Sequence, residues 1–479
     1  MEIFKMHIVG REKEQTVIAD CLASVRSEFL VLYGRRRVGK TFLIREYFND
    51  AFSFYATGVA NGNTREQLKA FNAALLQYGS TEKRIPVDWF EAFERLCRVL
   101  EGSSVKRDPE FGKRVVFLDE LPWMDTARSD FKTALDWFWN SYGSAKDDLL
   151  LIVCGSATSW IISNILTDTG GLYNRITRQL HLAPFTLKEC EALLAFNGIT
   201  LSRRQMIESY MIFGGIPYYL NLLNRRQSLA QNIDELCFSE HGQLRYEYER
   251  LFRSLFKKAD RHIAIIKALA EKHSGMTRVE LGETGCIGNG DALTRALNEL
   301  EQCGFIRKYK NFVKNKQGYY FQLIDPFTLF SLHFLQEPAF SSWLSYTGTP
   351  GYYSWCGNAF ELVCLNHSPQ IKSTLGISGV ETMEYAWRSI QDEGGAQIDL
   401  LIDRRDGVIN LCEMKYTLEP FAIDANYEDI LIHKRELFRE ETGTKKALYV
   451  TLVSAEGLRQ NSHSGVIQAL IRGDDLFGS

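Results

Sequence analysis

The 479-residue sequence lacks the features that mark membrane, secreted and disulfide-rich proteins. It has no uninterrupted apolar run of about 18 residues, the length that a membrane span requires. The start, MEIFKMHIVGREKE, does not have the charged-then-apolar order of a signal peptide. Its 10 cysteines are scattered without a CxxC pair, which argues against a zinc ribbon or a disulfide framework. These absences predict a soluble, cytoplasmic protein whose cysteines are reduced core residues.

The sequence also has no strong excess of charge of either sign. Its net charge is −3, with 24% charged and 45% hydrophobic residues, which are ordinary values for a globular protein. A net charge so near zero gives no general attraction to nucleic acid, so any DNA contact must come from a local basic patch. The chain is too long for one core, and its length predicts about three domains.

Short apolar runs alternate with amphipathic stretches in the first part of the chain. The runs FLVLY, FSFYA, VVFLD and LLIVCG are almost uninterrupted, as expected of parallel strands that are covered on both faces. Residues 41–48, 64–78 and 88–100 lie between them and have helical periodicity. Strands alternating with helices predict an α/β fold with a doubly wound parallel sheet.

The pattern changes three times further along the chain, and it predicts four parts. The α/β domain is expected at residues 1–186, a helical lid at 187–256, and a winged helix-turn-helix with a helical bridge at 257–345. The winged helix is predicted because three helical stretches precede two strands with a basic connection. Residues 346–479 are expected to form a second α/β domain.

A phosphate-binding loop follows the first predicted strand. The segment GRRRVGKT at residues 34–41 fits G-x-x-x-x-G-K-[ST] and lies between a strand and a helix, as the motif requires. In such a loop, backbone N–H groups and a helix N-terminus surround phosphate. Lys40 is expected to reach the β- and γ-phosphates, and the Thr41 hydroxyl to bind Mg²⁺. The other predicted nucleotide-binding residues here are Gly34, Arg35, Arg36, Arg37, Val38, Gly39 and Phe42.

Two acids end another buried strand. The apolar run VVFL places Asp119 at the carboxyl end of the strand, where ligands bind in open α/β sheets. Asp119 is expected to hold Mg²⁺ through water, and Glu120 to polarise the attacking water as a general base. The alternative is a pair of solvated acids. Ser156 either orients water or is a turn residue, and Arg175 either stabilises charge, from the same or a neighbouring subunit, or is a surface residue.

The segments GREKE, GRRRVGKT, VVFLDELPWMD and FGGIPYYL, in this order, resemble the archaeal-type ATPase family, a P-loop group close to AAA+ and STAND ATPases. The resemblance covers roughly residues 1–340 and implies ATP binding and hydrolysis. It implies contacts beside the adenine base for Val9, Gly10 and Arg11. It also implies that an element of the helical lid reports the nucleotide state, here Gly215, Ile216 and Pro217.

An acid and a lysine interrupt an apolar strand in the last part of the chain. Glu413 and Lys415 lie on one face of this strand because side chains alternate. Burying these two charged side chains in an apolar strand costs free energy unless they pair with each other or bind a metal. Asp399, in the preceding strand, is expected to come beside Glu413, and two acids with a metal ion and a lysine can activate water for phosphodiester cleavage. The alternatives are a surface ion pair, and Asp403 in place of Asp399.

This D…ExK pattern resembles the PD-(D/E)xK nuclease superfamily, and the domain resembles the module often found behind archaeal-type ATPases. The resemblance assigns Asp399, Glu413 and Lys415 to the signature and Glu361 to its helical acid. It implies a restriction-endonuclease-like fold and a Mg²⁺-dependent endodeoxyribonuclease with Asp399 and Glu413 as metal ligands. A domain retained only for protein contact is the alternative.

Basic residues of the third part gather on one predicted hairpin. The predicted recognition helix, GDALTRALNELEQCG, has one arginine against three acids, which disfavours an approach to phosphates. The segment FIRKYKNFVKNK interleaves basic and aromatic residues and suits a nucleic-acid backbone better. Its basic residues are Arg307, Lys308, Lys310, Lys314 and Lys316. A hairpin that serves as a protein–protein spacer is equally compatible with this composition.

The sequence therefore predicts a P-loop ATPase that binds ATP and Mg²⁺, and whose hydrolysis cycle moves a lid and winged helix to gate a DNA nuclease domain. The rival hypothesis is a signalling or regulatory switch that acts through protein or DNA contacts and has an inactive C-terminal domain. A transcription regulator led by the winged helix is a third hypothesis. Whether the chain forms a homo-oligomer is left open.

Overall fold

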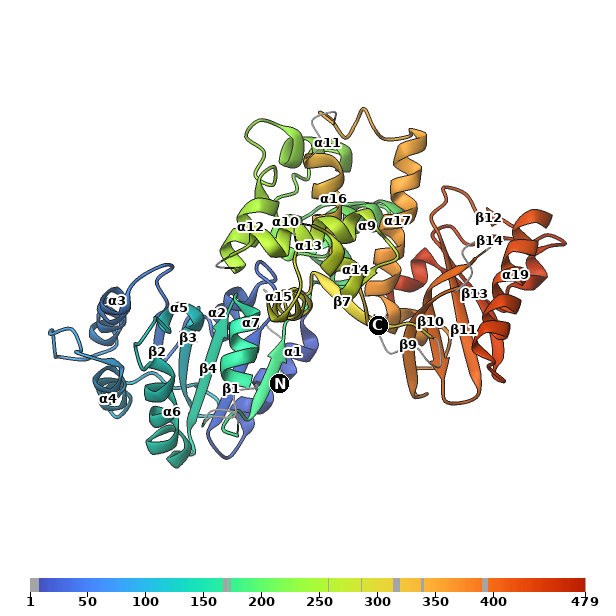
Figure 1. The fold of residues 1–479 in the computed structure, drawn as a ribbon. Helices are drawn as coiled ribbons and strands as arrows, with labels where there is room; N and C mark the ends of the chain where they lie inside the picture. The colour runs from blue at the N-terminus through green and yellow to red at the C-terminus, as the bar shows by residue number, and fades with distance from the viewer. Residues whose placement is uncertain are drawn as a thin grey trace. The chain divides into compact units, whose positions relative to one another are not determined.

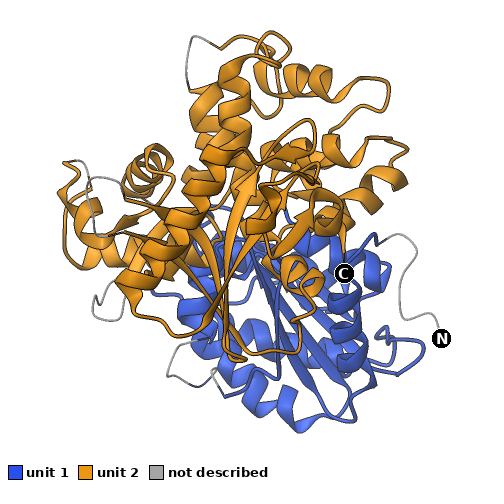
Figure 2. Cartoon of the chain, turned by 90° about the vertical axis from the view of Figure 1, so that its right-hand side faces the viewer, with its two compact units in different colours: residues 1–183 blue, residues 184–479 orange. Residues whose placement is uncertain are grey.

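The computed structural model of the chain is shown in Figure 1, and it describes residues 8–166, 171, 174–256, 258–285, 287–312, 319–336, 340–389 and 395–478. The chain forms two compact units, Met1–Ala183 and Pro184–Ser479 (Figure 2). The finer division into four parts stays a prediction. Among the described residues, no helix is long and apolar enough to cross a membrane. The nine cysteines described are free, and eight of them are buried.

Unit 1 is built on a five-stranded parallel sheet with the order β2-β3-β4-β1-β5. Both β3 and β4 are buried along their whole length, which requires apolar side chains on both faces and explains their uninterrupted apolar runs. The predicted parallel α/β sheet is therefore confirmed. The strands are β1 (Glu28–Tyr33), β2 (Phe54–Thr57), β3 (Arg114–Asp119), β4 (Leu149–Gly155) and β5 (Arg178–His181).

Helical segments of unit 1 cover the sheet on both faces (Figure 1). Phe29, Val116 and Leu151 project from one face into a core shared with α3, α4 and α6. On the other face the ring of Phe117 lies 5.6 Å from that of Phe52, which follows α2. The segments are α1 (Glu12–Ala23), α2 (Lys40–Phe48), α3 (Thr64–Gln77), α4 (Trp89–Leu100), α5 (Leu121–Met124), α6 (Phe131–Ser141), η1 (Gly143–Ala145), α7 (Thr158–Ile161) and η2 (Ile162–Leu166).

Unit 2 begins with a helical region whose ends are set by local sequence. Three helices start with a capping box, in which Thr186, Ser202 and Ser228 accept the N–H three residues on. The helix before FGGIP ends because Gly214 and Gly215 have φ of 64° and 67°, and a Cβ on Gly215 would lie 2.2 Å from the Phe185 carbonyl oxygen. The elements are α8 (Leu187–Phe196), α9 (Arg203–Phe213), α10 (Pro217–Leu220), α11 (Leu229–Ile233), η3 (Asp234–Phe238) and α12 (Glu247–Leu255).

Three helices and an antiparallel sheet of order β6-β8-β7 come next. The three helices and then β7 and β8 follow one another as expected from the sequence, but β6, between the first two helices, was not predicted. The winged-helix assignment and DNA binding stay predictions. Lys314 and Lys316 lie outside the described residues. The elements are α13 (Asp260–Glu271), β6 (Met276–Thr277), α14 (Arg278–Glu283), α15 (Asp291–Gln302), β7 (Ile306–Lys310) and β8 (Tyr319–Leu323).

The helical bridge that follows consists, among the described residues, of α16 (Pro326–Phe330) and η4 (Ser331–Leu335). The backbone N–H groups of Trp343 and Leu344 donate to the side-chain carboxylate of Asp234, the latter at 3.1 Å. These donors therefore bond to a side chain rather than to a helical carbonyl.

A mixed five-stranded sheet of order β15-β13-β11-β10-β9 forms the C-terminal part of unit 2. The pairs among β9, β10 and β11 are antiparallel, and β13 is parallel to β11 and β15. Strand β9 has no clear sequence pattern because it lies at the sheet edge, where only Ala386 and Trp387 are buried. The elements are α17 (Pro350–Asn366), α18 (Ser368–Thr374), β9 (Thr382–Arg388), β10 (Gln397–Arg404), β11 (Val408–Lys415), β12 (Phe421–Ala422), α19 (Ala425–Thr442), β13 (Ala447–Ser454), β14 (Leu458–Arg459), η5 (Ser464–Val466), β15 (Ala469–Arg472) and η6 (Gly473–Phe477).

The β7–β8 hairpin packs against the C-terminal sheet within unit 2. The Phe312 N–H donates to the Ala386 carbonyl at 3.0 Å, and the Phe312 ring lies 5.3 Å from that of Phe438. Arg307, which the sequence grouped with phosphate-contacting residues, donates from Nη2 to the Asp399 carbonyl at 3.1 Å. Its guanidinium is therefore directed towards the C-terminal sheet.

His367 connects α17 to the helical region and is fully buried. Its Nε2 accepts the Leu187 N–H at 2.9 Å, and its Nδ1 donates to the Val363 carbonyl at 2.7 Å. Burial lowers the pKa of His367 from 6.5 to about 4. The folded chain therefore holds this imidazole neutral at pH values where the unfolded chain protonates it.

We expect acid to weaken unit 2 through His367. Because the folded pKa is depressed, the stability is complete above pH 6.5 and is lost as pH falls from there towards 4. Between pH 7 and pH 5 this group is expected to remove about 2 kcal/mol from the free energy of unfolding. Urea titrations at both pH values would measure this loss. In His367→Gln, whose amide oxygen can still accept the Leu187 N–H, the difference between the two pH values should shrink by that amount; an unchanged difference would contradict the assignment.

Candidate functional site

The loop at residues 34–41 closes tightly between β1 and α2. Gly34 and Gly39 have φ of 144° and 93°, values that residues with a Cβ rarely adopt, and Gly39 caps the helix that begins at Lys40. The Lys40 ammonium donates to the carbonyl oxygens of Gly34 at 2.8 Å and Arg35 at 2.9 Å. Its charge therefore lies inside the loop, where the motif predicts a phosphate.

The N-terminal segment at residues 9–11 is attached to this loop. The Arg11 side chain is buried, and its Nη2 donates to the carbonyl oxygens of Val38 at 3.2 Å and Ala183 at 2.8 Å. Val9 and Gly10 precede it, with Gly10 in the left-handed region at φ 67°. The Val38 side chain is itself buried.

Thr41 and Asp119, the two predicted magnesium ligands, are in contact. The Thr41 hydroxyl lies 3.1 and 3.0 Å from the two carboxylate oxygens of Asp119. The Cys154 thiol, from the adjacent strand β4, donates to Asp119 Oδ1 at 2.6 Å. Burial raises the pKa of Asp119 despite these donors. A hydroxyl beside a carboxylate provides the oxygen ligands that Mg²⁺ takes together with water and phosphate oxygens.

Glu120 and Ser156 come together from the ends of β3 and β4. One Glu120 carboxylate oxygen accepts the Ser156 N–H at 3.2 Å and its hydroxyl at 2.9 Å. Glu120 has a left-handed φ of 49°, an uncommon conformation that clusters at functional sites. Position 58 has no room for a side chain, because a Cβ on Gly58 would lie 2.5 Å from the Glu120 carbonyl oxygen.

Three other predicted residues of unit 1 are exposed to solvent. Arg36 and Arg175 are exposed, and the Phe42 side chain is 55% exposed. Arg37 has a left-handed φ of 71° within the loop. Their roles at the nucleotide stay predictions, as does the reporting role of the Gly-x-Pro element, Gly215, Ile216 and Pro217, which belongs to unit 2.

Gly34→Ala is expected to destabilise unit 1 by about 3 kcal/mol, because the new Cβ would lie 2.3 Å from the Leu182 carbonyl oxygen at a φ of 144°. Gly112→Ala is a matched control, since Gly112 also has a positive φ, 69°, but nothing lies within 4 Å of its added Cβ. The control should lose only about 1 kcal/mol. Urea unfolding and nucleotide affinity of both variants would measure the effects, and equal losses would show that the contact with Leu182 is unimportant.

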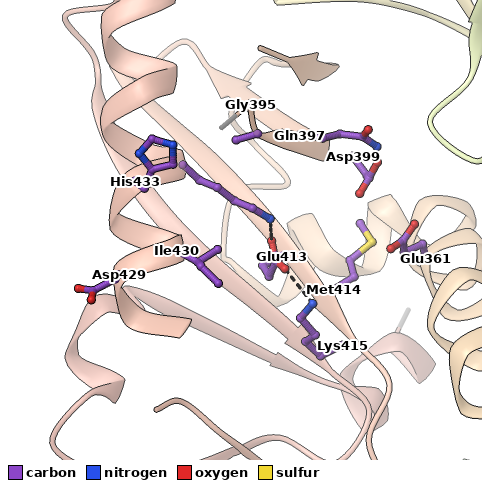
Figure 3. A pocket seen from close by; sticks show the side chains of 12 residues that line it. Glu361, Gly395, Gln397, Asp399, Glu413, Met414, Lys415, Asp429, Ile430 and His433 are labelled. Atoms are coloured by element: carbon purple, nitrogen blue, oxygen red, sulfur yellow. Dashed lines mark hydrogen bonds and ion pairs between the residues drawn. The ribbon is translucent and has the colours of Figure 1, made fainter. Parts of the chain in front are cut away.

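A second group of charged side chains lines a pocket of about 660 Å³ in the C-terminal part of unit 2 (Figure 3). The pocket lies between β10, β11, α17 and α19. It contains all four residues that the sequence predicted for a nuclease-like site. Its lining consists of Glu361, Gly395, Ala396, Gln397, Asp399, Glu413, Met414, Lys415, Asp429, Ile430, His433 and Lys434.

Glu413 is at the centre of this pocket. Its Oε1 lies 3.0 Å from Lys415 Nζ and accepts the Tyr427 hydroxyl at 2.5 Å, while its Oε2 lies 2.8 Å from Lys434 Nζ. Burial opposes its ionisation, but the charges of Lys434 and Lys415 and the hydrogen bonds hold the pKa of Glu413 below its usual value. Tyr427 and Lys434 were not predicted, although their spacing of seven residues places them on one face of a helix.

Two other acids of the pocket are Glu361 and Asp399. Burial, together with the charges of Asp399 and Glu413, raises the pKa of Glu361 to about 8. Asp399 Oδ1 accepts the Gln397 side-chain N–H at 2.5 Å. Asp399 and Glu413 lie one residue beyond the last pair of the β10–β11 ladder, Leu400 with Cys412, and both line the pocket.

Asp403, the alternative acid, lies at the other end of β10. It pairs with Ile409 across the ladder, and its Oδ1 is 2.5 Å from Lys446 Nζ. Asp403 therefore does not line the pocket, and the geometry favours Asp399. Among the described residues, no group of three or more His, Cys, Asp or Glu side chains is arranged to hold a metal ion.

Comparisons with known proteins bear on the N-terminal part of the chain. Residues 8–223 match the family model described as an ATPase domain predominantly from Archaea. An uncharacterized protein of Methanocaldococcus jannaschii is 25% identical over 334 residues, which are 68% of this chain and 68% of that protein. Among solved structures, the Walker-type ATPase of Pyrococcus abyssi is 19% identical and covers 68% of this chain and 96% of its own, with a TM-score of 0.47. The ORC2 protein of Aeropyrum pernix in ADPNP–ADP complexes is 14% identical and covers 69% and 96%, with a TM-score of 0.44.

The family match spans the phosphate loop, Asp119, Glu120 and Ser156. The geometry of these residues and the family match both indicate a nucleotide-binding P-loop domain. The match therefore supports an ATPase domain of the archaeal type at residues 8–223.

Proposed function

We propose that the chain hydrolyses ATP, with Thr41 and Asp119 as the groups that hold Mg²⁺. The observation that carries the proposal is the contact of the Thr41 hydroxyl with both Asp119 carboxylate oxygens, made across 78 residues of sequence. Mg²⁺, when bound, neutralises charge on the β- and γ-phosphates. The loop N–H groups bind the phosphates, and Lys40 exchanges the Gly34 and Arg35 carbonyls for phosphate oxygens.

Glu120 is the proposed general base. Its carboxylate lies at the carboxyl end of β3, next to Asp119, and accepts two hydrogen bonds from Ser156. In the proposed reaction Glu120 takes a proton from the attacking water, and the Ser156 hydroxyl helps to orient that water. Arg175, which is exposed, is available to a neighbouring subunit as a charge-stabilising group.

Phosphate release from ATP by the purified chain tests this function. Release is expected with Mg²⁺ and is expected to stop when EDTA removes the metal, while wild type run beside Lys40→Ala controls for contaminating ATPases. Tight nucleotide binding without turnover would instead favour the regulatory switch.

We propose metal-dependent DNA cleavage as the function of the C-terminal pocket. The observation that favours it is the convergence of Glu361, Asp399, Glu413 and Lys415 from a helix and two strands on one pocket. Two carboxylates with a divalent ion can activate water, and the Lys415 ammonium can stabilise the developing charge on phosphate. Lys308 and Lys310, placed 4.0 and 5.6 Å from the Tyr319 ring centroid, are proposed to contact the DNA backbone.

Supercoiled, linear and single-stranded DNA, incubated with Mg²⁺ or Mn²⁺ and with or without ATP, test this second function. Metal-dependent nicking is expected, and a change on adding ATP would support control by the ATPase domain. If ATP does not change the rate of cleavage, the ATPase domain does not control it. If no condition gives cleavage, the C-terminal part is an interaction module.

A further inference from the structure

Lys434 approaches Glu413 from outside the D…ExK pattern. It belongs to α19, and its side chain pairs with Glu413, which is labelled in Figure 3. Its Nζ lies 2.8 Å from Glu413 Oε2, the oxygen that Lys415 and Tyr427 do not contact. Both oxygens of this carboxylate are therefore engaged by protein donors.

The two lysines come from different elements. Lys415 follows Glu413 by two residues on the same strand, so the sheet places both side chains on one face. Lys434 reaches the carboxylate from a separate helix. Its four-carbon stem has several rotatable bonds, as has that of Lys415, so its ammonium can withdraw without a change in the backbone.

The carboxylates of the pocket attract cations, but the Lys434 ammonium already lies where a cation would bind Glu413. A divalent ion within bonding distance of Glu413 Oε2 would be strongly repelled by an ammonium 2.8 Å from the same atom.

We propose that Lys434 is a built-in competitor for the divalent cation of the C-terminal pocket, and that the cation binds Glu413 only by displacing the Lys434 ammonium. The proposal rests on the metal-dependent function proposed for this pocket, and it adds a regulation of that site. The displaced ammonium remains beside the pocket, where it meets the phosphate of a bound nucleic acid.

Calorimetric titration with Mn²⁺ alone tests the competition. The full chain is used without nucleotide and with Asp119→Asn, so that the metal position of the ATPase domain is removed. Lys434→Met, which keeps most of the stem and removes the charge, is expected to bind Mn²⁺ at least about tenfold more tightly. Lys434→Gln serves as a second neutral variant, and thermal unfolding of each protein checks that it is folded.

Lys446→Met is the matched control, since Lys446 pairs with Asp403 of β10 at 2.5 Å and lies outside the pocket. Its Mn²⁺ affinity should equal that of the parent chain, and Glu413→Gln should abolish the binding. Unchanged or weaker Mn²⁺ binding in both neutral Lys434 variants would overturn the proposal. If both variants bind Mn²⁺ more tightly but the wild-type chain cleaves no DNA, the competition stands and the cleavage function fails.

Discussion

Replacing Glu120 with glutamine is expected to slow ATP hydrolysis about 100- to 10,000-fold, the range that a positioned general base contributes. Glutamine has the same shape but cannot take a proton from water. Its amide oxygen can still accept the Ser156 hydroxyl, which lies 2.9 Å from the carboxylate in the wild-type chain. Thr41 and Asp119 are unchanged, so ATP and Mg²⁺ should bind as before. Phosphate release measures hydrolysis, and the affinity for a fluorescent ATP analogue measures nucleotide binding.

The matched control is Glu94→Gln, an exposed acid on α4 whose loss should leave turnover within about twofold. A Glu120→Gln variant that hydrolyses ATP at a rate near that of wild type would place the base elsewhere. A variant that loses ATP binding as well as turnover would show that Glu120 supports the nucleotide site rather than the chemistry.

The main parts of the nucleotide site could be predicted because they are local or follow from sheet geometry. The loop motif lies between a strand and a helix, and the carboxyl ends of parallel strands meet at one edge, so Thr41 and Asp119 were expected near each other. The bond from Cys154 to Asp119 and those from Arg11 to Val38 and Ala183 were not predicted. They join segments far apart in sequence, and no spacing rule connects such residues.

In the C-terminal pocket, the alternation of side chains along a strand predicts only part of the site. A period of two places Glu413 and Lys415 on one face, but it cannot choose between Asp399 and Asp403, which are four residues apart. The folded structure decides, because Asp399 lines the pocket with Glu413 whereas Asp403 lies beside Lys446 outside it. Lys434 was missed because the packing of α19 on β11, and not the sequence of either element, brings it to Glu413.

Replacing Glu413 with glutamine is expected to reduce metal-dependent DNA cleavage by at least about 100-fold, since a metal ion supplies several kcal/mol of charge stabilisation. The amide removes the negative charge that holds the cation but keeps an oxygen that can accept from Tyr427 and Lys415. Unit 2 should therefore stay folded. ATP hydrolysis, which is assigned to the other unit, should remain within about twofold of wild type. Nicking of supercoiled DNA and phosphate release, measured on the same preparation, separate the two activities.

Asp399→Asn and Asp403→Asn form a matched pair for this experiment, because both change an acid of β10 to its amide. Asp399→Asn should lose cleavage like Glu413→Gln, whereas Asp403→Asn should keep it, since its carboxylate lies against Lys446 and outside the pocket. The reverse result would make Asp403 the metal-binding acid and would require a different register or pocket. Cleavage that survives both Glu413→Gln and Asp399→Asn would come from another part of the chain or from a contaminant, and the pocket would then have no part in it.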